Sequence, residues 1–151
     1  MAAPPILTTI KKNNSNVDVV IAVSKLGNTL ILDRVTGKSL FEMKKVLAPT
    51  SNVPGERTSH YQFQNEIPEP VCRNKITKND LSDFLYVDKA KINEVFENSE
   101  YGFPNPPKIG IKNIHIGSCV RWAGASVDTQ KNILYVSTDL FPYLVSHQTF
   151  F

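Results

Sequence analysis

Lys25 and Gly27 are the residues of this 151-residue chain whose types and spacing best suit chemistry. A lysine ammonium offers three hydrogen-bond donors and no acceptor, so it suits an oxygen that becomes negatively charged during a reaction. A glycine two residues later lets the backbone turn tightly at the rim of a pocket. Taken from these residues alone, a solvated lysine at the end of a strand is the alternative interpretation.

The chain has two cysteines, Cys72 and Cys119. Their positions give no C-x-x-C or C-x-x-C-H spacing, which argues against a zinc site, a thioredoxin-like site or a covalently attached haem. We expect two free thiols that are buried as small hydrophobic groups. A disulfide between them is the alternative that the sequence leaves open.

Histidines and aspartates give no sign of a metal site. The three histidines share no ligand spacing, which argues against a zinc hydrolase; they are His60, His115 and His147. Asp18, Asp33 and Asp128 stand in turns or at strand edges, where a short carboxylate commonly accepts backbone N–H groups. We therefore interpret these aspartates as structural.

Composition excludes two classes of partner. The formal charge of +3 comes from 17 basic and 14 acidic residues that are well mixed, which argues against nucleic-acid binding. No segment approaches the roughly 20 apolar residues of a membrane-spanning helix. The first residues carry no charged segment followed by an apolar run, so we expect no signal peptide in this chain.

The segment that holds Lys25 is predicted to be β-structure. Short runs rich in β-branched residues occupy 6–10, 17–23 and 29–32, separated by clusters of Asn, Ser and Gly. A meander of three antiparallel strands is the simplest arrangement of these runs. The Lys-x-Gly turn then connects the second strand to the third.

The rest of the chain is predicted to be a long loop, a helix and more strands. Residues 46–80 are rich in Pro and polar residues without hydrophobic period, and so indicate a loop. Apolar residues at helical spacing predict a helix over about 88–98. A shorter helical turn is predicted over 79–84, with Asp80 as its N-cap. Strands are predicted at 109–116, 123–127 and 133–137, with a turn at 128–132. We interpret these last strands as a second partial blade.

Several segments match, in order, the motifs of one enzyme family. Lys25 to Phe41 contains a Lys-x-Gly turn, a strand and a Leu-Asp-Arg-x-x-Gly turn. Further matches are Pro-Gly-Glu at 54–56, Trp-Ala-Gly-Ala-Ser-Val-Asp at 122–128 and Leu-Tyr-Val at 134–136. Together they resemble the pyrroloquinoline quinone (PQQ)-dependent quinoprotein dehydrogenases, most of all the membrane-bound glucose dehydrogenase type. Phe41 stands where the family's blade-docking motif has Trp, so an aromatic anchor is kept without the indole N–H.

The resemblance implies four cofactor-binding residues. Lys25 corresponds to the lysine that the family places against the quinone, and Trp122 to a residue at the cofactor end of the propeller. Arg121 takes the place of a Glu or Asn. Ser137 falls where the glucose dehydrogenase type has an Asn near the quinone, and its shorter side chain would replace a direct contact by a water-mediated one.

Oxidation of an alcohol requires a base for the hydroxyl proton, a quinone carbonyl that accepts hydride, and positive charge near the quinone oxygens. Lys25 fits the third role. The resemblance implies that the catalytic aspartate, and the groups that bind Ca²⁺ or Mg²⁺, lie upstream of the matching segment. We therefore expect no catalytic residue and no metal site in this chain, and no activity when it is isolated.

The fold implied is all-β: about two incomplete blades of an eight-bladed quinoprotein propeller, with an inserted long loop and one short helix. We expect a single partial propeller domain over 1–151. Its parts would be a first blade region at 4–45, the loop and helix insertion at 46–107, and a second blade region at 108–145. A blade needs four strands, so this chain cannot close a propeller.

The function implied is that of a fragment of a PQQ-dependent dehydrogenase, which oxidises a sugar, polyol or alcohol hydroxyl by hydride transfer to the quinone. Its partners would be the substrate, a quinone electron acceptor and the missing propeller blades. The parent enzyme would work in the periplasm or at the periplasmic face of the inner membrane. The alternative hypothesis is a non-catalytic blade that binds or assembles with other proteins, because exposed strand edges need a cover.

Overall fold

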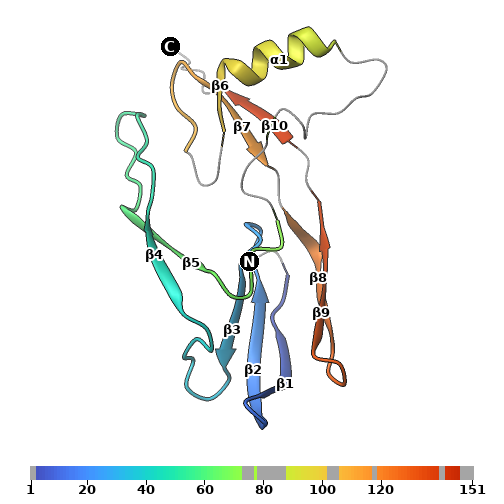
Figure 1. Ribbon diagram of the computed structural model, residues 1–151. Coiled ribbons are helices and arrows are strands. Elements are labelled where there is room, and N and C mark those ends of the chain that lie inside the picture. Colours follow the sequence, from blue (N-terminus) through green and yellow to red (C-terminus); the bar gives the residue numbers. More distant parts are fainter. Residues whose placement is uncertain are drawn as a thin grey trace. The chain divides into compact units, whose positions relative to one another are not determined.

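The computed structural model describes residues 3–72, 77, 88–101, 106–116, 119–139 and 142–146, and it is mostly β-structure (Figure 1). The elements in chain order are β1 (Ile6–Lys12), β2 (Ser15–Val23), β3 (Thr29–Asp33), β4 (Met43–Leu47), β5 (Tyr61–Asn65), α1 (Lys89–Glu97), β6 (Ser99–Tyr101), β7 (Lys112–Ile116), β8 (Val120–Asp128), β9 (Ile133–Thr138) and β10 (Pro142–Ser146). The expectation of β-structure with one short helix is confirmed for these residues. Their strands form no closed propeller.

The chain divides into two compact units. Unit 1 comprises Met1–Lys45, Phe63–Cys72 and Ser118–Leu140. Unit 2 comprises Val46–Gln62, Arg73–Gly117 and Phe141–Phe151. Unit 1 holds every residue that the sequence indicated for cofactor binding.

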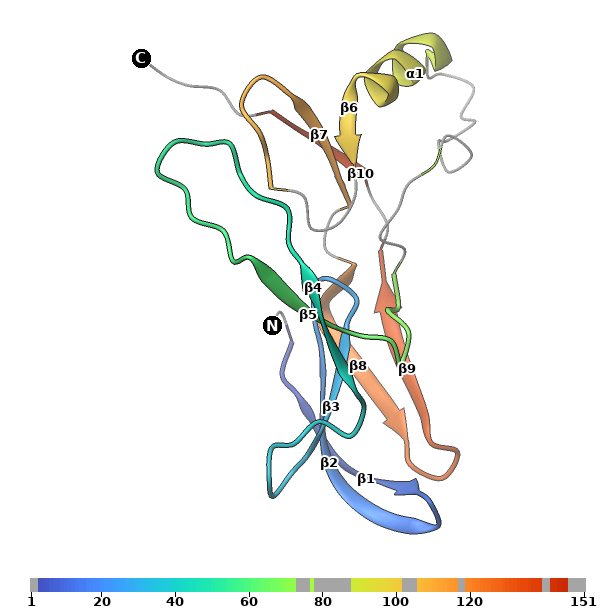
Figure 2. The ribbon, with the colours of Figure 1, turned by 60° about the vertical axis from the view of Figure 1, so that its left-hand side comes forward.

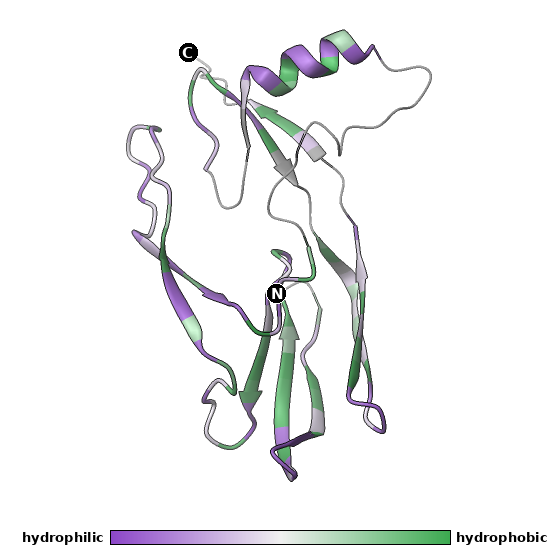
Figure 3. Ribbon diagram, in the orientation of Figure 1, coloured by the Kyte–Doolittle hydropathy of each residue, from purple (hydrophilic) through white to green (hydrophobic). Residues whose placement is uncertain are grey.

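Unit 1 is built on the predicted meander, β1–β2–β3, which is antiparallel throughout. Val19 and Ile21 are buried on one face of β2, and Ala22 and Val23 at the end of the strand are buried as well. Figure 3 shows hydrophobic residues along β2 and hydrophilic ones at the turn that joins it to β1. Asn13 and Asn14 make that turn with positive φ angles of 50° and 61°, a conformation that asparagine tolerates.

The second sheet of unit 1 is the hairpin β8–β9 (Figure 2), whose turn was predicted correctly. Oδ1 of Asp128 accepts the backbone N–H groups of Gln130 and Lys131, both at 3.0 Å. Between Val120 and Ala125 the pairing shifts register, which marks a bulge in β8. β8 packs against β1 and β2.

The core of unit 1 includes a cluster of four buried residues, Val23, Cys72, Cys119 and Val120. The prediction of free thiols was wrong, because Cys72 and Cys119 form a disulfide with their Cα atoms 5.9 Å apart. The two cysteines are 47 residues apart, and their approach depends on tertiary folding that the spacing of cysteines does not reveal. Their burial was predicted correctly, at 7% and 2% exposed.

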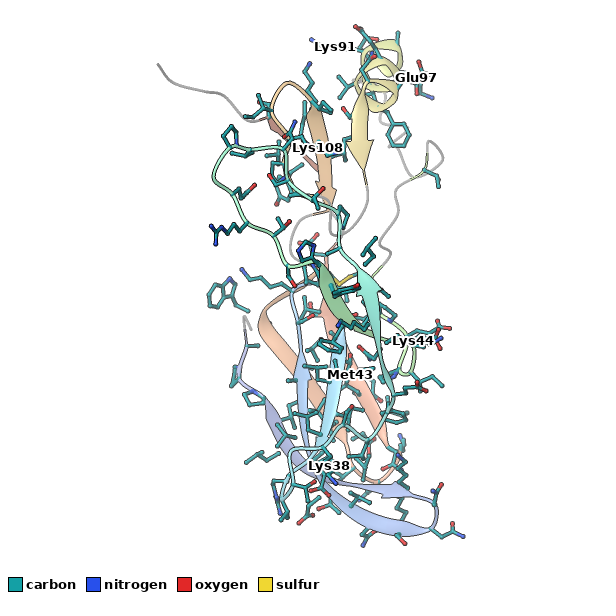
Figure 4. The ribbon with its side chains drawn as sticks, turned by 90° about the vertical axis from the view of Figure 1, so that its left-hand side faces the viewer. Lys38, Met43, Lys44, Lys91, Glu97 and Lys108 are labelled. Atoms are coloured by element: carbon teal, nitrogen blue, oxygen red, sulfur yellow. A yellow bond between two sulfur atoms is a disulfide. The ribbon has the colours of Figure 1, made fainter. Side chains whose placement is uncertain are left out.

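Part of the predicted loop at 46–80 is instead β-structure, because β4 and β5 pair in a two-stranded sheet. The alternation Tyr-Gln-Phe-Gln in β5 is the signal that the loop prediction overlooked. Lys44 on β4, labelled in Figure 4, binds Glu66 at 2.5 Å. That carboxylate hydrogen bond, together with its charge, raises the pKa of Lys44 above its ordinary value of 10.5.

Unit 2 contains α1 and a three-stranded sheet in the order β10–β7–β6. The predicted helix is confirmed, and Asp88 caps it by accepting the N–H groups of Ala90 and Lys91 at 3.0 and 3.2 Å. The strands expected together as a second partial blade divide between two sheets, since β7 pairs with β6 and β10 rather than with β8. The short helical turn predicted at 79–84 lies outside the described residues.

Candidate functional site

The turn that carries Lys25 is closed by backbone and side-chain hydrogen bonds of Ser24. The backbone N–H of Ser24 donates to the carbonyl of Asn28 at 2.8 Å, and the carbonyl of Ser24 accepts the N–H of Gly27 at 3.0 Å. The Ser24 hydroxyl also accepts the N–H of Asn28 at 3.1 Å. The sequence therefore produces a tight loop between β2 and β3, from which the exposed Lys25 side chain projects.

Gly27 is required at its position for two reasons. Its φ of +83° lies in the left-handed region, which favours glycine. A Cβ atom at this position would lie 3.1 Å from the backbone nitrogen of Cys72 and 3.2 Å from Sγ of Cys119. The disulfide therefore lies directly against the turn, and only a residue without a side chain allows that approach.

Two backbone hydrogen bonds attach the turn to the chain segments on either side of the disulfide. The N–H of Cys119 donates to the carbonyl of Lys25 at 3.0 Å, and the N–H of Val71 donates to the carbonyl of Gly27 at 2.9 Å. The bond between the two sulfur atoms appears in yellow in Figure 4. Three segments that are distant in sequence are thus fixed to one another.

The same attachment brings Lys25 to Trp122. Nζ of Lys25 lies 5.1 Å from the centroid of the Trp122 ring, within the range of a cation–π contact. Trp122 is 75% exposed, so its ring is available to a ligand. An ammonium group beside an open indole suits a planar, negatively charged molecule, which can stack on the ring and accept hydrogen bonds from the lysine.

The other two candidates are less closely tied to this pair. Ser137 is exposed on β9, and the pairing of Val120 with Thr138 places it at the same end of the β8–β9 hairpin as Trp122. No contact between Ser137 and Lys25 is found among the described residues. Arg121 precedes Trp122 in β8, and its side chain lies outside the described part of the structure.

The aspartates have the structural roles that were predicted. Oδ1 of Asp33 accepts the N–H groups of Val35 and Thr36 and the Thr36 hydroxyl at 2.7–3.0 Å. The hydrogen bond from the Thr36 backbone is the main reason that the pKa of Asp33 lies below its ordinary value of 3.8. Asp18 accepts the Thr9 hydroxyl at 2.6 Å and pairs with Arg34. Within the described ranges, no three His, Cys, Asp or Glu side chains form a group that could hold a metal ion.

Asn65 is a positioning residue that the sequence did not indicate. Its side-chain amide is buried and donates to the carbonyls of Thr29 and Pro68 at 2.8 and 3.0 Å. These bonds hold the segment that leads to Cys72 against the start of β3. No motif marks Asn65, because its partner at Thr29 is 36 residues away.

Comparisons of the sequence with known proteins identify the family. The sequence pattern described as the glucose/ethanol/alcohol dehydrogenase β-propeller domain, named for PQQ, matches residues 1–149. A quinoprotein glucose dehydrogenase from Gluconobacter oxydans (strain 621H) is 24% identical over 144 residues, or 93% of this chain. The chain spans 18% of that relative's length. No solved structure gives a significant match. The chain therefore belongs to the family of PQQ-dependent dehydrogenase β-propeller domains.

Proposed function

We propose that this chain supplies one wall of the quinone site of a PQQ-dependent dehydrogenase that oxidises a sugar, polyol or alcohol hydroxyl. The observation that carries the proposal is the contact between Lys25 and Trp122, at 5.1 Å from Nζ to the ring centroid. These two residues are far apart in sequence, and the family resemblance implies that both contact the cofactor. Family membership gives the class of cofactor.

The residues of this wall fit the chemistry of the cofactor. PQQ is a planar quinone that carries carboxylates, so an exposed indole and an ammonium group suit its ring and its charge. When bound, it supplies the carbonyl that accepts a hydride from the substrate. Lys25 would hold the quinone and donate to its oxygen, while Trp122 would limit its movement and exclude water from one side. Arg121 and Ser137 are the further proposed contacts, at the same end of the hairpin.

The catalytic base and the ligands for Ca²⁺ or Mg²⁺ are assigned to other parts of the complete enzyme. The short span of the match, 18% of the relative's length, supports this division. Among the described residues, unit 1 carries the sheets β1–β2–β3 and β8–β9 and parts of β4 and β5, which is fewer than the eight strands that two four-stranded blades need. We therefore propose that the chain contributes about two incomplete blades of an eight-bladed propeller and is inactive alone. The assignment of 4–45 and 108–145 to two blade regions stays a prediction.

The disulfide supports an oxidising compartment for the protein. Structural disulfides form and persist in secreted and periplasmic proteins and are rare in the reducing cytosol. Among the described residues, no helix is long and apolar enough to cross a membrane. We propose the periplasm, or the periplasmic face of the inner membrane, as the location of the complete enzyme, with a quinone as its electron acceptor.

The proposal is tested by titrating the folded chain with PQQ in the presence of Ca²⁺. Trp122 is the only tryptophan, so its fluorescence reports directly on the proposed site. We expect saturable quenching in the wild-type chain. Because a hydrogen bond to a charged group contributes about 1.5–3 kcal/mol, Lys25→Ala is expected to weaken binding roughly 10- to 100-fold.

Lys11→Ala is the matched control, because Lys11 is also an exposed lysine at a strand of unit 1. It removes the same charge from the chain without touching Trp122, so its PQQ affinity should equal that of the wild type. Equal losses in both variants would mean that PQQ responds only to net charge, and the proposed site would be refuted. Absence of saturable binding in the folded wild-type chain would refute it as well.

A second candidate function is that of a non-catalytic assembly module. Ile133 and Tyr135 project from the same face of β9 and are 41% and 53% exposed, in a sheet of only two strands. Such a face is suited to packing against a neighbouring blade. If this function applies, the double variant Ile133→Ser and Tyr135→Ser will remain monomeric in light scattering where the wild-type chain self-associates, and PQQ will bind neither.

A further inference from the structure

We propose that the Cys72–Cys119 disulfide is a positioning element, which sets the contact between Lys25 and Trp122 and makes ligand binding there depend on the oxidised state. The identity of the ligand rests on the proposed function, whereas the positioning itself does not.

The disulfide joins the two segments that hold the Lys25 turn. Val71, which precedes Cys72, donates its N–H to the carbonyl of Gly27 at 2.9 Å. Cys119 itself donates to the carbonyl of Lys25 at 3.0 Å. The covalent bond thus links the two segments whose N–H groups bind the five-residue loop between β2 and β3. Trp122 follows Cys119 by three residues in the same extended segment.

Packing makes the disulfide an immediate neighbour of the turn. A Cβ atom added to Gly27 would lie within 3.1–3.2 Å of Cys72 and of Sγ of Cys119, so no other side chain separates the turn from the bridge. Both cysteines belong to the buried apolar cluster with Val23 and Val120. Once the S–S bond is broken, two backbone hydrogen bonds and apolar contacts remain to hold the two segments against the turn.

The position of the Lys25 ammonium depends on that backbone attachment, because its side chain is exposed and is not confined by a core. An exposed lysine samples many rotamers, so its contact with Trp122 persists only while the two backbones stay at a fixed separation. Reduction would therefore weaken the contact even in a chain that stays folded. With a dithiol reductant, the S–S bond accepts two electrons and two protons to give two thiols, and the dithiol becomes a cyclic disulfide.

The positioning is measured without the cofactor by collisional quenching of Trp122 fluorescence. Iodide is attracted by the nearby ammonium and neutral acrylamide is not. The quenching constant of iodide divided by that of acrylamide therefore reports how close Lys25 lies to Trp122. Four samples are compared. The wild-type chain and Lys25→Ala are each measured in the oxidised form, and again after reduction, capping of the thiols with iodoacetamide and removal of the reductant. We expect the ratio to be about twofold higher in the oxidised wild type than in oxidised Lys25→Ala, as a screened charge at this distance predicts.

Reduction and capping should lower the wild-type ratio to that of Lys25→Ala and leave the ratio of Lys25→Ala unchanged. This dependence on Lys25 separates positioning from a general loss of stability, which would change both chains alike. A reduced wild-type chain that keeps the oxidised ratio overturns the proposal. If capping unfolds the chain by circular dichroism, Cys72→Ala with Cys119→Val replaces the capped sample, because it fills the apolar cluster without a bulky adduct.

A PQQ titration of the same four samples connects the disulfide to the ligand. We expect reduction to weaken PQQ binding of the wild-type chain about tenfold, and to have no further effect in Lys25→Ala, since one charge-assisted contact is lost in each case. If oxidised wild type fails to bind PQQ while the quenching ratios behave as described, the proposed function fails and the positioning stands. If PQQ binds equally before and after reduction, the disulfide does not govern the site and the inference fails.

Discussion

The backbone N–H of Cys119 donates to the carbonyl of Lys25 at 3.0 Å, across 94 positions of sequence. This bond connects the end of β2 to the start of β8, and a disulfide to Cys72 reinforces the connection. Its consequence is that a lysine and a tryptophan from opposite parts of the chain contact each other at an exposed position.

Trp122→Ala is expected to leave stability nearly unchanged, because the side chain is 75% exposed. Surface substitutions of this kind change the free energy of unfolding by less than about 0.5 kcal/mol. Val120→Ala is the contrasting variant, since Val120 is 1% exposed and belongs to the buried cluster. Removal of its two methyl groups should cost about 2 kcal/mol. Urea unfolding followed by circular dichroism gives both values, and a loss above about 1 kcal/mol in Trp122→Ala would mean that the ring is structural.

Gly27→Ala is expected to be much more destabilising than Gly37→Ala. Both glycines have positive φ angles, +83° and +70°, so each substitution should cost about 1–2 kcal/mol in backbone strain. The added Cβ meets nothing within 4 Å at Gly37, whereas at Gly27 it meets Cys72 and Cys119 at 3.1–3.2 Å. This crowding should add about 1–3 kcal/mol, measured as the difference between the two free energies of unfolding in urea. Equal costs would show that the disulfide yields to the new side chain.

Asp33 is expected to contribute stability that depends on pH. Its pKa lies below 3.8 in the folded chain because it accepts hydrogen bonds from Thr36, so the contribution is present above the ordinary pKa and is lost as the pH falls through the folded value. Asp33→Asn keeps an acceptor oxygen but cannot titrate. Between about pH 5 and about pH 2 it should therefore lose less stability than the wild type. Thr36→Ala removes one hydrogen-bond donor, so the free energy of unfolding of this variant should change with pH by an intermediate amount. If that free energy changes with pH identically in all three chains, this account is contradicted.

Asp88→Ala tests the helix of unit 2. The carboxylate of Asp88 accepts two N–H groups at the start of α1, and its removal should cost about 1 kcal/mol of helix stability. Asp88→Asn and Asp88→Ser retain an acceptor and should restore most of that loss. Helical circular dichroism of the three variants provides the measurement. The same loss in the Asn and Ala variants would indicate that the charge matters more than the cap.

Local patterns in the sequence were sufficient for most elements. The meander of β1–β3, the helix α1 and the β8–β9 hairpin depend on alternating or helical periodicity and on turn residues such as Asp33 and Asp128, which act within a few positions. The two-stranded sheet of β4 and β5 was missed because β5 lies among prolines and polar residues, where composition indicated a loop. The partners of β7 were not predicted, because hydrophobic alternation does not specify the partner of a strand, and the structure pairs β7 with β6 and β10.

The sequence by itself determined the family, the candidate cofactor residues Lys25 and Trp122, and the need for glycine in the turn that follows Lys25. The tertiary structure decided that Lys25 and Trp122 meet, that Cys72 and Cys119 form a disulfide, and that Asn65 holds the adjoining segment. The physical reason is range. Turn chemistry and periodicity act between neighbours in the chain, whereas these three relationships join residues 36 to 97 positions apart. They depend on tertiary contacts, such as the packing of β8 against β1 and β2 and the hydrogen bond from Asn65 to the start of β3.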